Sequence, residues 1–184
     1  MTLPDAAGGT DRSPPPSPEE PSVDVVEPAA LLAGHLDRLR SGVETKLAGL
    51  SEEQLHSSLL PSGWSPLQLV WHLVHVERRW LRWGFRAEQL TEPWGDEDAD
   101  ERWRVPPGMS TAEVLEAFRT ECARSRAVCE GADLRRRAEV GGRFGTTEEA
   151  PTLSWILFHL LQEYARHLGQ LDVVRELSDG AVGE

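Results

Sequence analysis

Residues 63–80 read GWSPLQLVWHLVHVERRW, and residues 153–170 read LSWILFHLLQEYARHLGQ. In the first stretch Ser65 is a favourable N-cap and Pro66 suits the first turn of a helix. Thr152 caps the second stretch in the same way. In both, apolar residues recur every three or four positions, which is typical of an amphipathic helix. The two predicted helices span residues 66–85 and 153–177.

Two more long helices are predicted outside this pair. Residues 28–49 carry leucines at helical spacing, and Pro28 suits the first turn. Residues 110–131 open on a capping-box pattern and continue with apolar residues at helical spacing. A second capping-box pattern, at residues 51–54, predicts a short turn or helix. These elements together favour an all-α protein built as a four-helix bundle.

The two connections between the last three long helices are long. Residues 87–108 carry prolines, glycines and a run of acidic residues, so we expect an irregular loop. Residues 132–150 contain three glycines and an alternating segment at 140–144, which predicts a loop with one short strand pair. Long connections permit crossovers, so a simple up-down-up-down order is not required.

Composition excludes several classes of protein. The chain has 184 residues, 39% of them hydrophobic, which suffices for one domain with a core. Its formal net charge of −12 disfavours binding to nucleic acid or to anionic membranes. No apolar run approaches the roughly 20 residues of a membrane span, and the N-terminus lacks the pattern of a secretory signal. We therefore expect a cytoplasmic protein with no nucleic-acid or membrane partner.

The N-terminal segment differs from the rest. Residues 1–26 hold six prolines, few apolar residues and an excess of acidic ones, so we predict a disordered acidic tail. The folded domain then comprises residues 27–184.

Polar residues on the apolar faces of the two signature helices indicate a site. Glu163 and His167 are four residues apart, so both side chains can reach one atom from the same helix face. His72 lies on the flank of the apolar face of the other helix. If the two helices pack together, these three residues form a divalent-metal site with open positions, suited to Zn, Ni, Fe or Mn. The alternative is histidines that are each satisfied separately at a helix interface.

These stretches resemble the DinB superfamily. The runs at residues 63–73 and 76–80 resemble the family's second helix, and those at 153–157 and 163–170 resemble its last helix. The similarity is greatest to an actinobacterial branch described as a domain of unknown function, and it covers roughly residues 28–178. It also extends to bacillithiol- and mycothiol-dependent transferases and to mycothiol-dependent maleylpyruvate isomerase.

The resemblance implies a bundle of up-down-down-up order with a divalent metal, zinc by first choice, at one end of its core. It assigns the metal ligands to His72, Glu163 and His167. Many members have histidine at the position of Glu163, whereas the maleylpyruvate isomerase branch has glutamate. Bundles of this family often pair, so a homodimer is an open alternative.

Other residues near the expected metal have two interpretations each. Gln170 either orients a ligand or is a satisfied core amide. The arginines could bind the thiol cofactor or be surface charge, and the tryptophans could form a substrate cage or be core. His75 and His159 are expected to be partly exposed and structural. The arginines meant are Arg78, Arg79, Arg82 and Arg166, and the tryptophans are Trp71, Trp80, Trp83 and Trp155.

The resulting hypothesis is a metal-dependent thiol S-transferase or isomerase that uses a low-molecular-weight thiol, by preference mycothiol, and a small-molecule electrophile. Cys122 and Cys129 are seven residues apart on one helix face and are expected to be buried free thiols rather than the nucleophile. Two alternatives stay open: a hydrolase that uses metal-activated water, and a non-enzymatic bundle that binds a metal or small ligand.

Overall fold

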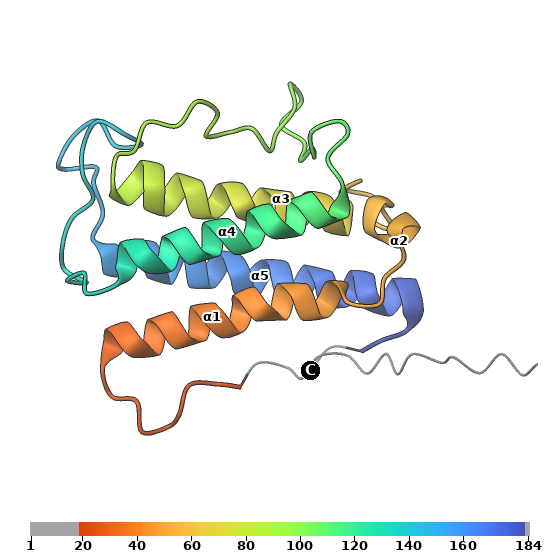
Figure 1. The fold of residues 1–184 in the computed structure, drawn as a ribbon, viewed down its shortest axis with the longest axis horizontal. Coiled ribbons are helices and arrows are strands. Elements are labelled where there is room, and N and C mark those ends of the chain that lie inside the picture. The colour runs from red at the N-terminus through yellow and green to blue at the C-terminus, as the bar shows by residue number, and fades with distance from the viewer. Residues whose placement is uncertain (1–18, 183–184) are drawn as a thin grey trace, which may run out of the picture.

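A computed structural model describes residues 19–182 of the chain. Within this range four long helical segments lie side by side as a bundle, and no strand is present (Figure 1). α1 and α5 run in one direction and α3 and α4 in the other, which is an up-down-down-up order. The elements are α1 (Pro28–Leu47), α2 (Glu52–His56), α3 (Pro66–Glu77), η1 (Arg78–Phe85), α4 (Thr111–Cys129) and α5 (Leu153–Asp179).

The predicted helix starts are confirmed by their caps. Ser65 accepts a hydrogen bond from the Gln68 backbone N–H, and the Gln68 side chain accepts one from the Ser65 N–H. Ser110 and Glu113 form the same reciprocal pair at the start of α4. These bonds satisfy backbone donors that have no partner inside a helix, so they fix where each helix begins.

The second long helix departs from the predicted regular α-helix. At Arg78 it becomes a π-helix, η1, which runs to Phe85. The backbone of Gly84 lies close to the Arg79 carbonyl oxygen, and a Cβ at Gly84 would stand only 2.8 Å from that oxygen. Because a π-helix has more residues per turn, the helical wheel that assumes 100° per residue misplaces side chains beyond Glu77.

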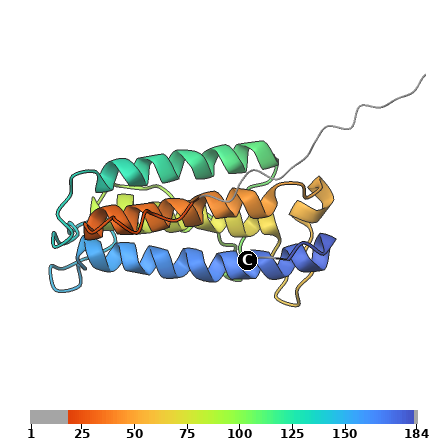
Figure 2. The same ribbon diagram turned by 90° about the horizontal axis from the view of Figure 1, so that it is seen from below.

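The core contains a buried ion pair beside its leucines and valines. Arg40 of α1 contacts both carboxylate oxygens of Glu77 at 2.8 and 3.0 Å, and the Tyr164 hydroxyl donates to Glu77 at 2.6 Å. Glu77 is fully buried and Arg40 nearly so. This network joins α1, α3 and α5. Seen from below, α1 and α5 lie side by side (Figure 2).

The connections are irregular, as expected, but the predicted short strand pair within residues 132–150 is wrong. The described chain has only isolated bridges there and in the preceding loop, between Arg137 and Thr152 and between Glu97 and Trp103. Hydrogen bonds that hold 132–150 run instead to the ends of η1 and α5.

Most of the predicted N-terminal tail, residues 1–18, lies outside the described residues. Residues 19–26 form no helix and reach α1, where Glu20 lies 3.5 Å from Arg38. No helix in the described part of the chain is both long and apolar enough to cross a membrane.

Candidate metal centre

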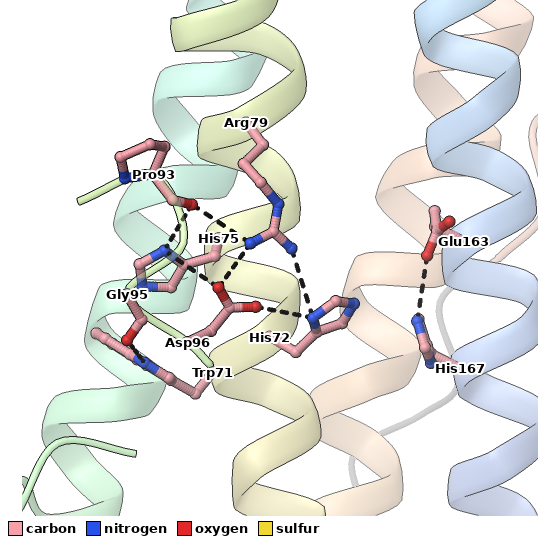
Figure 3. Close-up of polar contacts among 9 residues, drawn as sticks. All are labelled: Trp71, His72, His75, Arg79, Pro93, Gly95, Asp96, Glu163 and His167. Atoms are coloured by element: carbon pink, nitrogen blue, oxygen red, sulfur yellow. Dashed lines mark hydrogen bonds and ion pairs between the residues drawn. The ribbon is translucent and has the colours of Figure 1, made fainter. Parts of the chain in front are cut away.

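Three potential ligands meet between α3 and α5. One ligand atom each from His72, Glu163 and His167 can be chosen so that all lie within 4.8 Å of one another. Figure 3 shows the His72 ring directed from α3 toward the pair on α5. The rings of His72 and His167 meet edge to face, with centroids 5.1 Å apart. The structure therefore brings together the three residues that the sequence singled out.

His72 is held from behind by a loop residue. Its Nδ1 lies 2.9 Å from Oδ2 of Asp96, and its ring stacks on Trp103 at 4.2 Å between centroids. When Nδ1–H donates to this carboxylate, Nε2 carries a free lone pair, as in the carboxylate–histidine pairs that support metals. Burial lowers the pKa of His72, which favours the neutral imidazole that a metal needs.

His167 is oriented in a similar way within its own helix. Its Nδ1 lies 2.8 Å from Oε1 of Gln170, while its Nε2 lies 3.2 Å from Oε2 of Glu163. Glu163 also contacts Nε2 of His159 at 3.3 Å through its other oxygen. The hydrogen bond from His167 lowers the pKa of Glu163, so the carboxylate is ionised at neutral pH. Gln170 thus occupies the orienting position that its spacing suggested.

Asp96 is the centre of a buried polar network on the far side of His72. Its Oδ1 accepts a hydrogen bond from Nη1 of Arg79 at 2.6 Å (Figure 3). Burial by itself raises the pKa of Asp96, but the hydrogen bonds from His72 and Arg79 lower it below the ordinary value. Asp96 is therefore a fixed negative charge that supports His72. Arg79 acts on this network rather than at the open side of the cluster.

His75 differs from its prediction. It was expected to be partly exposed, yet it is only 2% exposed because the loop around Pro93 and Gly95 covers it. Burial lowers its pKa to about 4. Its Nδ1 points to Pro93 and Asp96 and away from the three-ligand cluster.

Three further candidates, Arg82, Arg166 and Trp83, do not direct their side chains into the cluster. Arg82 pairs with Glu88 at 2.7 Å and with Glu121 at 3.2 Å, which directs it toward α4. Arg166 is exposed on the outer side of α5. Trp83 is half-buried near the glycine-rich part of the 132–150 loop. Within the described structure no hydrogen bond, ion pair or ring contact joins these three side chains to the side chains of the ligand residues.

The two cysteines are unsuited to nucleophilic chemistry. Cys122 is buried between α4 and the Glu77 network, and burial raises its pKa to about 12. Cys129 is half-buried, and burial raises its pKa to about 11. Both are free thiols, as predicted, although Cys129 is less buried than predicted. Their raised pKa values argue against a protein thiolate at neutral pH.

The donor set fits a divalent metal ion. Two imidazole nitrogens and one carboxylate are typical ligands of Zn²⁺ and of neighbouring transition metals. With both rings steadied at Nδ1, each can offer Nε2 to one point. Three protein ligands leave at least one coordination position for an external group, which is the arrangement of a catalytic rather than a closed structural site.

Sequence reasoning missed Asp96 and Trp103. Both lie in the 87–108 loop, which has no periodicity from which a direction could be inferred. A histidine on an apolar flank needs a buried partner, and an acidic run close behind in sequence was the available signal. It did not indicate which of the five carboxylates would turn inward.

A protein-family model described as mycothiol S-transferase matches residues 31–180, which includes all four long helical segments except the first turn of α1. No curated protein matches the chain.

Proposed function

This chain belongs to the mycothiol S-transferase family, and we propose that it is a metal-dependent enzyme that transfers the sulfur of mycothiol to a small electrophile. The observation that carries the metal dependence is the convergence of His72, Glu163 and His167 from two helices. Each of the two imidazoles has its own orienting partner, which a chance contact of histidines at a helix interface would not require.

The proposed ligands have a charge suited to a thiolate. Two neutral imidazoles and one carboxylate leave a divalent ion, with zinc the expected metal, at a net charge of about +1. Such an ion, when bound, would offer the thiol sulfur a coordination position and favour the deprotonated thiol at neutral pH. With Nδ1 of His72 donating to Asp96 and Nδ1 of His167 donating to Gln170, Nε2 of both rings would face the metal, which would replace the contact between Nε2 of His167 and Glu163.

In the proposed reaction a new sulfur–carbon bond forms as the bond from that carbon to its leaving group breaks. With an alkyl halide the halide departs, and with an epoxide the ring oxygen takes up a proton. The protein needs no nucleophile of its own, in agreement with the protonated state of Cys122 and Cys129. We place the reaction in the cytoplasm, where low-molecular-weight thiols are kept reduced. A homodimer remains a prediction.

A cobalt-substituted protein tests the proposal. Addition of mycothiol should produce a sulfur-to-cobalt charge-transfer band, and the thiol should accelerate loss of an alkyl halide or an epoxide. The double variant Cys122→Ser/Cys129→Ser should retain both signals, since the sulfur comes from the cofactor. Glu163→Gln should weaken both by removing a ligand charge.

The two other functions give different results in the same experiment. A hydrolase would turn over an ester without any thiol, and mycothiol would leave its cobalt spectrum unchanged. A binding protein would take up cobalt but catalyse neither reaction. Absence of a sulfur band with millimolar mycothiol would refute thiol transfer.

A further inference from the structure

Arg143, in the loop that packs on η1, has no counter-ion among the described residues. Nη1 of Arg143 is buried and has no hydrogen-bond partner, and no carboxylate pairs with this side chain among residues 19–182. Leaving a buried donor unpaired costs about 1–3 kcal/mol, and more for a charged group. In a chain of net charge −12 the absence of a carboxylate here is unexpected. Such a group is accounted for when an external anion supplies the missing acceptor.

The backbone holds Arg143 in this position. Its N–H donates to the Trp83 carbonyl oxygen at 3.2 Å, and the N–H of Gly141 donates to the Phe144 carbonyl oxygen, which closes a turn around it. Gly142 packs so tightly on η1 that a Cβ there would overlap the Trp83 carbonyl oxygen and the Ala87 backbone. Glycine at position 142 is therefore required for the loop to approach η1. This close packing places the Arg143 guanidinium against the Trp80 ring.

Aromatic rings surround the guanidinium on the protein side. Its Cζ lies 4.2 Å from the ring centroid of Trp80, 5.5 Å from that of Trp94 and 5.9 Å from that of Trp83. The rings stabilise the cation without neutralising it, because a ring quadrupole carries no net charge. Arg143 therefore remains a cation without a counter-ion among the described residues.

Two chains of contacts join Arg143 to the metal centre. On one side the ring centroid of Trp80 lies 4.2 Å from Cζ of Arg143 and 4.2 Å from the ring centroid of His159. His159 in turn contacts Glu163. On the other side Trp94 contacts Arg143 and also lies 4.4 Å from Arg79, which is beside His72. Trp155 stacks on His159 and extends the same aromatic surface along α5.

We propose that Arg143 binds a carboxylate of the electrophilic substrate, and that Trp80 and its aromatic neighbours hold an unsaturated or aromatic body between that carboxylate and the metal centre. The assignment of the ligand as the electrophile rests on the proposed S-transferase function; the anion site itself does not.

Calorimetric titration with 4-methylbenzoate tests the anion site without any reaction. The wild-type protein, both as purified and after treatment with EDTA, should bind this anion at least tenfold more tightly than neutral 4-methylbenzamide. Arg143→Gln should reduce that preference to less than twofold, and Arg143→Lys should restore part of it. Arg135→Gln is the matched control, because Arg135 lies in the same loop but is 91% exposed, and it should retain the preference. A preference lost with EDTA would assign the anion to the metal and overturn the proposal.

A comparison of steady-state kinetics with two substrates separates this inference from the proposed function. With mycothiol present, the ratio of kcat/KM for 4-(chloromethyl)benzoate to that for 4-(chloromethyl)benzamide should exceed ten in the wild type and approach one in Arg143→Gln. Turnover without this preference would overturn the inference while the S-transferase function stands. Anion preference in calorimetry without thiol-dependent turnover would support the site and refute the function. If Arg143→Gln fails to fold, the wild-type preference and its partial retention in Arg143→Lys decide the question.

Discussion

Asp96→Asn is the sharpest test of the candidate metal centre, because it changes the charge behind a proposed ligand without altering the ligand. Asp96 is fully buried and lies 2.9 Å from His72 on one side and 2.6 Å from Arg79 on the other. The asparagine keeps the shape and one acceptor oxygen but loses the negative charge. We therefore expect that the variant favours the Nδ1-protonated tautomer of His72 less strongly, and that Arg79 is buried without a counter-ion.

Two magnitudes follow. Loss of such a supporting carboxylate costs about 10- to 100-fold in metal affinity, or roughly 1.4–2.7 kcal/mol. Removing one partner of a buried ion pair costs about 3–5 kcal/mol of folding stability, and the retained acceptor should keep this near 3. For a chain of this size that corresponds to a fall in Tm of about 6–12 °C.

Zinc affinity should be measured by competition with a chromophoric chelator at 20 °C, where the variant stays folded, and stability by thermal unfolding monitored by circular dichroism. Asp100→Asn is the matched control, since Asp100 belongs to the same acidic run but is exposed. It should change neither quantity appreciably. A folded Asp96→Asn protein that binds zinc within threefold of the wild type would show that Asp96 does not orient a ligand.

Three further outcomes are expected. His167→Ala should lose most bound metal in elemental analysis, whereas His159→Ala should keep it, because His159 contacts Glu163 from outside the three-ligand cluster. If both variants retained the same amount of metal, His167 would not be a ligand. Glu77→Gln should lower the free energy of unfolding in urea by about 3 kcal/mol, since it removes the fully buried counter-ion of Arg40 and leaves only the half-exposed Asp37. A loss below about 1 kcal/mol would contradict the buried pair. The pKa of His75 is about 4 in the folded protein and about 6.5 in the unfolded chain. Between these two pH values only the unfolded chain binds a proton at His75. The free energy of unfolding therefore falls as the pH decreases, by about 3 kcal/mol in total. His75→Gln should flatten this part of the pH profile in urea titrations, and an unchanged slope would be evidence against its burial.

Local interactions explain what could be predicted from the sequence. The starts of α3 and α4 depend on Ser65 and Ser110, each of which bonds to a residue three positions away. The meeting of Glu163 with His167 likewise follows from the pitch of one helix. These features need no knowledge of the rest of the chain. The family resemblance added the pairing with His72, which helical pitch alone left open.

Only the tertiary structure decided which distant groups support or flank that site. Asp96 reaches His72 across 24 residues of chain, and Arg40 reaches Glu77 across 37. Nothing in the sequence distinguishes Asp96 from the other four carboxylates of its acidic run, and nothing near Glu77 indicates a partner 37 residues away. The selection comes from burial: once packing has removed His72 and Arg40 from water, each stabilises the buried carboxylate that the fold brings within hydrogen-bond distance.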